Sequence, residues 1–403
     1  MSEIAYFDHS ATTPVDPAVR EAMEPYYSED FGNPSSPHSL GRKGREAVET
    51  AREQVAAILS ARPEEIYFTS GGTESDNWAV KSGVCNCAKC GQGRFVTTKI
   101  EHHAMLHACE FMAMMGFDVI YLDVDRQGLV DLDQLKREVS EGTNFVSVML
   151  ANNEVGTIQP LAAISEICRS AGVTIHTDAV QAAGKIPVDV GELGVDLLSI
   201  SAHKFYGPKG IGVLYSRKGH HLHPFMHGGS QEGKVRAGTH NVPAIVGLGK
   251  ACELSAERLT GTRAHLEKLG ARLWNGVKGS IEEVELSGPP EKRLPGLVSL
   301  IVRGIEGEAM LLLLDREGFE ASSGSACTSG SLDPSHVLMA MGYEAAVAHG
   351  SLRLSLGRDN TEAQVDRFIE VFPPIVNRLR SMSSRWAGAK AGAGGAGGAG
   401  GGE

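Results

Sequence analysis

The chain has no apolar run long enough to cross a membrane as a helix, and it has no excess of positive charge. Its 403 residues carry a formal net charge of −11. An acidic balance argues against nucleic acid or an anionic membrane surface as a direct partner. We therefore expect a function that involves neither nucleic acid nor a membrane.

Features of a secreted, disulfide-stabilised protein are also lacking. The first residues show neither a charged segment followed by an apolar one nor an Arg-rich transit segment. Seven cysteines are an odd number in a chain of this length, which is typical of thiols rather than of a disulfide framework. We expect a cytoplasmic protein.

Short apolar runs alternate with helical patterns through the first half of the chain. The length of the chain favours two domains. Strands are predicted at residues 65–69, 145–150, 173–177 and 196–201, with helical stretches such as 161–171 between them. This alternation predicts βαβ units and a mostly parallel sheet covered by helices on both faces.

The pattern changes in the second half of the chain. A long helical pattern at 244–278 is followed by an apolar run at 297–302, a helix at 306–317 and a last helix from about residue 361. We interpret this part as a smaller α+β domain. Residues 387–403 are nearly all Gly and Ala, cannot bury a core, and are predicted to be disordered.

One cysteine, Cys327, stands among small residues at 322–330. This segment follows a predicted strand and has little propensity for helix or strand. It is typical of an accessible loop whose thiol is suited to nucleophilic or sulfur-carrying chemistry. The alternative is a small cysteine buried under a loop.

Three other signals follow predicted strands. The Gly-Gly-Thr turn at 70–75 favours a phosphate, although it also fits an ordinary capped turn. Asp178 lies at the strand edge where open α/β sheets bind ligands, or else caps a helix. Lys204 is either a solvated charge or an amine that forms a Schiff base.

Pyridoxal phosphate uses all three groups: a lysine for its aldehyde, a carboxylate for its pyridine nitrogen and a cup for its phosphate. It also needs a flat side chain against its ring, for which His102 is the candidate, after a predicted strand at 94–98. The occurrence of these groups in order along one α/β chain favours this cofactor.

Further motifs carry a family resemblance, at residues 6–14 (YFDHSATTP), 31–36 (FGNPSS), 152–156 (NNEVG) and 351–358 (SLRLSLGR). With them, the chain resembles the NifS/IscS-like cysteine desulfurases of the class V aminotransferase group, from residue 6 to about 386. The resemblance implies an α/β fold, that of the fold type I pyridoxal-phosphate-dependent transferases. A large cofactor-binding domain at 16–257 would hold a mostly parallel seven-stranded sheet sandwiched by helices. Residues 1–15 and 258–386 would form a smaller α+β domain with the cysteine loop at about 320–334.

The same resemblance implies catalytic roles. Lys204 would hold pyridoxal phosphate, and His102 would stack on its ring and help to move protons. Cys327, as a thiolate, would take the sulfur of L-cysteine as a persulfide and leave L-alanine. The cofactor-binding set would be Gly72, Thr73, His102, Asp178, Gln181, Ser201, His203, Lys204 and Thr239. Thr239 would reach the phosphate of the neighbouring subunit in a homodimer, and Arg353, with Asn33 and Asn153, would bind the substrate carboxylate.

Partners follow from the same resemblance. The persulfide would pass to a sulfur acceptor or an iron–sulfur scaffold protein, for cluster assembly, nitrogenase maturation or other sulfur-containing molecules. Cys327 would also be a metal ligand during handover of a cluster. In the family the C-terminal end helps to dock the scaffold, whereas here a Gly/Ala stretch takes its place.

A C-x-C-x-x-C cluster at Cys85, Cys87 and Cys90 departs from the family pattern. Three close thiols suit zinc, part of an iron–sulfur cluster or a redox-switchable disulfide, but no fourth ligand is nearby. The alternative is an incidental surface loop. A second group, His220, His221, His223 and His227, is more typical of a polar surface than of a metal site.

Two other function classes stay open. One is a different enzyme of the same fold, a selenocysteine lyase or a class V aminotransferase, and a transaminase would not need the loop thiol. The other is a metal-binding scaffold protein that has kept the fold without the catalysis.

Overall fold

The structure is a computed structural model and describes residues 4–85, 93–139, 142–324, 333–383 and 386. The centre of the predicted cysteine loop and the whole of the predicted disordered tail lie outside these residues. Among the described helices, none combines the length and the apolarity that a membrane span needs.

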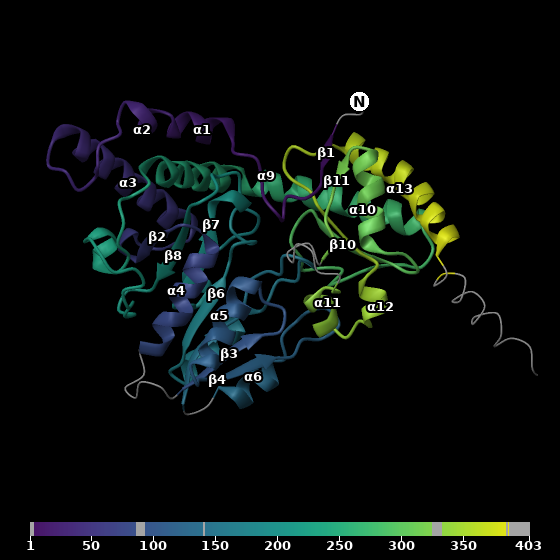
Figure 1. The fold of residues 1–403 in the computed structure, drawn as a ribbon, viewed down its shortest axis with the longest axis horizontal. Helices are drawn as coiled ribbons and strands as arrows, with labels where there is room; N and C mark the ends of the chain where they lie inside the picture. The colour runs from purple at the N-terminus through teal and green to yellow at the C-terminus, as the bar shows by residue number, and fades with distance from the viewer. Residues whose placement is uncertain (1–3, 86–92, 140–141, 325–332, 384–385, 387–403) are drawn as a thin grey trace, which may run out of the picture.

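A seven-stranded sheet forms the centre of the larger part (Figure 1), in the order β2-β8-β7-β6-β5-β3-β4. The strands are β2 (Ile66–Thr69), β3 (Arg94–Thr98), β4 (Asp118–Leu122), β5 (Thr143–Ser147), β6 (Thr174–Asp178), β7 (Leu197–Ser201) and β8 (Gly212–Ser216). Neighbouring strands are parallel except β8, which is antiparallel to both β2 and β7. The predicted α/β fold with a mostly parallel sheet is confirmed.

Helices cover both faces of this sheet, because alternate side chains of each strand point to opposite faces. Phe145 and Leu197 pack in the apolar cluster under α4 and α5, whereas Val146 and Leu198 pack on the opposite side. That second side is covered by α3, α7 and α9. The larger helices are α1 (Pro17–Met23), α3 (Ser39–Ile58), α4 (Gly72–Cys85), α5 (His103–Met114), α6 (Leu132–Glu138), α7 (Leu161–Ser170) and α9 (Val242–Ser280).

A second apolar core lies at the other end of the molecule. Its sheet has the order β12-β10-β9, from β9 (Val284–Leu286), β10 (Leu297–Val302) and β12 (Ser351–Ser355). The helices α10 (Gly307–Arg316) and α13 (Glu362–Met382) pack beside it. The N-terminal strand β1 (Ala5–Tyr6) joins this part by pairing with β11 (Phe319–Glu320). Phe7 therefore packs with Phe319 and Phe368, far from it in the sequence.

One helix connects the two cores. The first half of α9 contributes Ile245 and Leu248 to the core of the large sheet, and its second half contributes Leu269 and Leu273 to the second core. The predicted boundary between residues 257 and 258 therefore falls inside a continuous helix (Figure 1). The shorter elements are α2 (Pro25–Ser28), α8 (Val190–Leu193), α11 (His336–Ala340), α12 (Ala345–Ala348), and the 3-10 helices η1 (Pro63–Glu65), η2 (Ala202–Lys204) and η3 (Gln231–Lys234).

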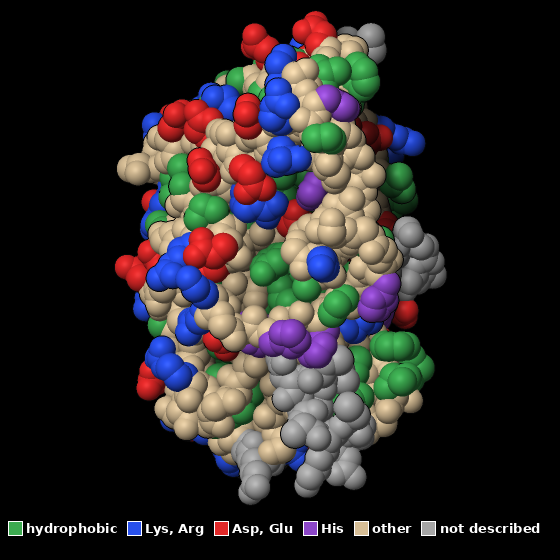
Figure 2. All heavy atoms as spheres, turned by 90° about the vertical axis from the view of Figure 1, so that its left-hand side faces the viewer, with side chains coloured by type: hydrophobic (Ala, Val, Ile, Leu, Met, Phe, Trp, Pro, Cys, Tyr) green, Lys and Arg blue, Asp and Glu red, His purple; other side chains and the backbone are tan. Residues whose placement is uncertain are grey.

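Charged side chains of both signs are interspersed on the face that Figure 2 shows, where no broad basic patch is visible. The expectation that nucleic acid is not a direct partner stays a prediction.

Candidate active site

A cavity of about 380 Å³ lies at the carboxyl ends of β6 and β7, between the large sheet and the second core. Its lining comes from both ends of the chain and from the middle. The residues are Asp8, Ser10, Ala11, Gly72, Thr73, Asp76, His102, Asn153, Asp178, Val180, Gln181, Ser201, His203, Lys204, Ser322 and Arg353. The structure thus brings most of the predicted cofactor and substrate residues to one place.

The lysine of the cavity is held by the N-terminal segment. Lys204 is the last residue of η2, directly after β7. Its Nζ donates hydrogen bonds to the carbonyl oxygens of Ser10, at 2.6 Å, and Ala11, at 2.9 Å. These two contacts fix the amine beside the other cavity residues.

Two buried carboxyl groups line the cavity. Asp178 ends β6, and burial raises its pKa to about 6, although the Val180 N–H and Lys204 act in the opposite direction. Asp76, on α4, is 1% exposed, and its Oδ1 has no hydrogen-bond partner among the described residues. Burial, and then the charge of Asp178, raise the pKa of Asp76 well above its ordinary value. We infer that Asp76 is the protonated member of the pair.

The Gly-Gly-Thr turn leads into α4 and leaves room for a ligand. A Cβ on Gly72 would lie 2.7 Å from Cγ2 of Val180, so only glycine fits there. The first N–H groups of α4, a helix of 14 residues, have no partner within the helix and attract an anion. Thr73, Ser201 and His203 also line the cavity and are possible further donors to a phosphate.

The ring of His102 stands at the N-terminus of α5, where its Nδ1 accepts a hydrogen bond from the Ala104 N–H at 3.1 Å. Burial, and then Lys204, lower the pKa of His102 to about 4. The imidazole is therefore neutral near pH 7. Because Nδ1 accepts, the ring proton is on Nε2.

Arg353 is almost completely buried, with 3% of its surface exposed. One terminal nitrogen pairs with Asp8 Oδ1 at 2.9 Å and the other donates to the Asn153 carbonyl at 3.2 Å. Its Nε has no hydrogen-bond partner within the described residues. A buried guanidinium with a spare donor at the cavity is suited to binding a carboxylate.

Together these residues fit pyridoxal phosphate. The cavity offers an amine, a buried carboxylate, a neutral ring and a helix N-terminus where a Cβ would fill the space. These are the groups that bind its aldehyde, its pyridine nitrogen, its ring face and its phosphate.

Two predicted residues do not line this cavity. Asn33 is exposed, and its Oδ1 accepts a hydrogen bond from the Ser35 N–H. Thr239 also lies away from it. Cys327 falls outside the described residues, but Ser322, in the first part of the predicted cysteine loop, lines the cavity and pairs with the backbone of Arg353.

The predicted metal cluster is only partly within the described chain. Cys85 is the last residue of α4, whereas Cys87 and Cys90 lie outside the described residues. In the part of the chain that the structure describes, no group of three or more His, Cys, Asp or Glu side chains is arranged to hold a metal ion. The four loop histidines at 220–227 form no such group either.

The sequence analysis missed three buried acids and one partly buried lysine near the cavity. They are Asp76, Glu101, Glu154 and Lys185. For Asp76 a signal was available, because it stands three and four residues after Thr73 and Gly72 and therefore on the same face of α4. The others have no local signal, since their burial depends on distant segments.

We predict that Glu101 makes the stability of the folded protein depend on pH. It is completely buried, burial raises its pKa to about 8, and its Oε1 accepts from the Thr98 hydroxyl and the Met149 N–H. A raised pKa means that ionisation opposes folding, so wild-type stability falls as pH rises from about 4.5 to about 8. Glu101→Gln imitates the protonated form. Relative to this variant, the free energy of unfolding of the wild type should fall by a few kcal/mol over this pH range, at most about 1.4 kcal/mol per pH unit.

The measurement is urea unfolding of both proteins at pH 5 and pH 8. The exposed Glu110, changed to Gln, serves as the control and should give the same stability difference from wild type at both values. An equal difference between wild type and Glu101→Gln at both pH values would contradict the prediction.

Comparisons with known proteins agree with this geometry. The profile of the class-V aminotransferase family matches residues 5–368. Cysteine desulfurase IscS of Clostridium botulinum (strain Hall) is 49% identical over 388 residues, which cover 96% of this chain and 98% of that protein. Cysteine desulfurase IscS of Methanosarcina thermophila is 51% identical over 382 residues, covering 95% of this chain and 94% of the relative.

Solved structures give the same result. A NifS-like protein superposes with a TM-score of 0.88 at 41% identity, over 93% of this chain and 100% of that chain. The structure of SspA in complex with cysteine superposes with a TM-score of 0.79 at 34% identity, over 88% of this chain and 99% of the other.

Proposed function

This chain belongs to the class V aminotransferase family, and from that premise we propose that it is a cysteine desulfurase, an enzyme that removes the sulfur of L-cysteine with pyridoxal phosphate. The observation that carries the proposal is the meeting of Lys204, Asp178 and Arg353 in one cavity. Relatives named cysteine desulfurase match over nearly the full length of both chains, and one similar protein was solved with cysteine bound.

The cofactor would be held by residues from three elements, α4, β7 and η2. Lys204 would bind it covalently, and Gly72, Thr73, Ser201 and His203 would hold its phosphate. When bound, pyridoxal phosphate withdraws electrons from the substrate and so weakens the bonds around its α- and β-carbons.

Four side chains would set the protons and hydrogen bonds at the cofactor. Asp178, as a carboxylate, would accept a hydrogen bond from the protonated pyridine nitrogen, and the protonated Asp76 lets Asp178 keep its negative charge. His102, neutral and protonated on Nε2, would cover the ring and carry a proton. Gln181 would donate its amide N–H to the phenolic oxygen.

The substrate would be bound through its carboxylate group. Arg353 would supply the bidentate fork, with Asn153 beside it and Asn33 assisting. Cys327, as a thiolate, would attack the substrate sulfur. A sulfur–sulfur bond forms as the carbon–sulfur bond breaks, and the electron pair and a proton go to the carbon, which leaves as L-alanine.

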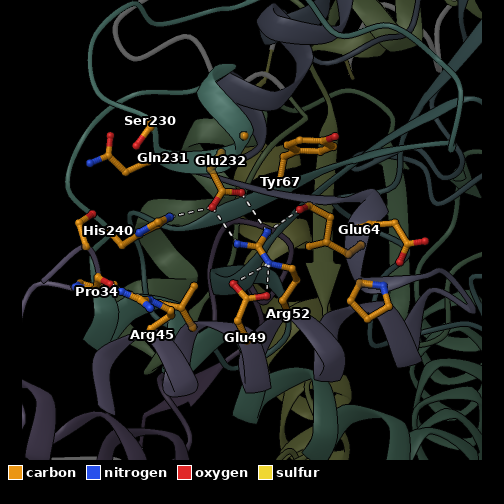
Figure 3. A pocket seen from close by; sticks show the side chains of 15 residues that line it. Pro34, Arg45, Glu49, Arg52, Glu64, Tyr67, Ser230, Gln231, Glu232 and His240 are labelled. Atoms are coloured by element: carbon orange, nitrogen blue, oxygen red, sulfur yellow. Dashed lines mark hydrogen bonds and ion pairs between the residues drawn. The ribbon is translucent and has the colours of Figure 1, made fainter. Parts of the chain in front are cut away.

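A homodimer would complete the cofactor site through Thr239. The segment before Thr239 is held firmly within one chain, at a second cavity of about 700 Å³ (Figure 3). There the buried Glu232 pairs with Arg52 at 2.9 Å and with His240 at 2.8 Å. Glu232 itself has a φ of 46°, a strained backbone that these contacts support. Such a fixed segment is suited to presenting Thr239 to a neighbour.

The persulfide would then pass to a sulfur acceptor, such as an iron–sulfur scaffold protein, with Cys327 as a ligand if a cluster is handed over. Cys85, Cys87 and Cys90 stay a candidate set for zinc or an iron–sulfur cluster.

The function is tested by incubating the purified protein with L-cysteine and a thiol reductant, which releases sulfide from the persulfide. Alanine and sulfide should appear in equal amounts, with a change in the cofactor absorbance. Formation of a keto acid only when a second keto acid is added would indicate a transaminase instead. Activity with L-selenocysteine but not with L-cysteine would indicate a selenocysteine lyase.

A further inference from the structure

Lys185 is a lysine beside the cavity that the proposed mechanism does not use. It ends the turn that follows β6, and it is partly buried. Its Nζ donates a hydrogen bond to Oε1 of Gln181 at 2.9 Å. Gln181 is 5% exposed and lines the cavity. Lys185 therefore acts on the cavity through Gln181.

This contact belongs to a longer chain of hydrogen bonds. Nε2 of Gln181 donates to the Ser10 carbonyl at 2.8 Å, and Nζ of Lys204 donates to the same oxygen at 2.6 Å. In its protonated form Lys185 can only donate, and this form requires the amide oxygen of Gln181 on its own side. The amide N–H groups must then point away from Lys185, toward Ser10. Lys185 thereby selects one of the two orientations of the amide.

Within the described chain, the groups whose charge interacts with that of Lys185 include four basic side chains. They are Lys204 from η2, Arg353 from β12, and His9 and His203. Burial, and then repulsion from Lys204 and Arg353, lower the pKa of Lys185 to about 7. Repulsion between two amines is mutual, so a charge on Lys185 also makes Lys204 easier to deprotonate.

The close approach depends on the preceding glycine. Gly184 has a φ of 74°, and a Cβ there would lie 2.6 Å from Cβ of Phe205, the residue after Lys204. No other residue allows the turn with Lys185 to pack this closely against the segment that carries Lys204.

We propose that Lys185 is a positioning residue, which orients the Gln181 amide and whose charge favours the deprotonated form of the Lys204 nitrogen. The inference rests on the proposed function, since it concerns the lysine that would hold pyridoxal phosphate.

The test is the pH titration of the visible absorbance of the bound cofactor in the purified holoenzyme. Lys185→Met and Lys185→Gln remove the charge, and Lys185→Arg keeps it. The first two should raise the midpoint of the titration, by on the order of one pH unit, because a repelling charge is lost. The arginine variant should stay within a few tenths of a unit of wild type, and so should Lys136→Met, a control at an exposed lysine of α6.

A midpoint that is unchanged in both Lys185→Met and Lys185→Gln would overturn the inference. If Lys185→Met does not fold or load, the comparison of Lys185→Gln with Lys185→Arg decides, since these differ in charge while both can donate a hydrogen bond. The two failures are distinguishable. A wild-type protein that binds no cofactor or forms no alanine from L-cysteine contradicts the proposed function, whereas an active protein with an unmoved midpoint contradicts only the role of Lys185.

Discussion

Replacing Lys204 by alanine is expected to abolish both the absorbance of the lysine-bound cofactor and the formation of alanine from L-cysteine. The Nζ of Lys204 is the amine that the cavity holds beside Asp178, and the substitution removes the atom that would bind the cofactor. The rate should fall by more than about 10³-fold. Absorbance spectra and alanine assays before and after addition of pyridoxal phosphate measure the two effects.

Lys209→Ala is the matched control, because Lys209 is an exposed lysine five residues further along the same segment. It should leave the spectrum and the rate close to wild type. Mass spectrometry of the reduced protein locates the cofactor adduct on Lys204 in the wild type. An adduct that persists on another lysine in Lys204→Ala would show that the cofactor is bound elsewhere.

Replacing Cys327 by alanine is expected to separate cofactor binding from sulfur transfer. The variant should keep the cofactor absorbance, since the cavity residues that would bind the cofactor are unchanged, but release of sulfide from L-cysteine should fall by more than about 10³-fold. After incubation with L-cysteine, intact-protein mass spectrometry should find one added sulfur on the wild type and none on the variant. Sulfide release at the wild-type rate would rule out Cys327 as the acceptor.

Other cysteines of the chain provide an internal control for this experiment. Cys109, Cys168 and Cys252 are free and buried. Burial raises the pKa of Cys109 and of Cys168 to about 12, so neither forms a thiolate near pH 7. Added sulfur should therefore not appear on these residues in either protein.

The part of the site that could be predicted consists of residues that follow strands. Gly72, Asp178 and Lys204 come just after β2, at the end of β6 and just after β7. These strands run in the same direction, so their carboxyl ends meet at one edge of the sheet. A local pattern of apolar runs was enough to predict both the sheet and this grouping.

The contribution of the N-terminal segment could not be predicted in the same way. Ala5 pairs with Phe319, and this places Asp8 against Arg353 and Ser10 against Lys204. Pairing between strands so far apart leaves no periodic signal in either segment, because it depends on how the two cores pack. For the same reason, nothing local indicated that Asn33 would lie away from the cavity of its own chain.

The sequence by itself therefore determined the alternation of strands and helices, the mostly parallel sheet and the kind of cofactor, because periodicity and strand-end residues are local properties. Only the tertiary structure decided which groups near that cofactor carry charge. In the sequence, nothing distinguishes the acids Asp76 and Glu101 or the base Lys185 from other residues of their types. Their pKa values are shifted by burial and by neighbours from distant segments, such as Asp178 and Lys204. Protonation depends on distances through space, and those exist only in the folded chain.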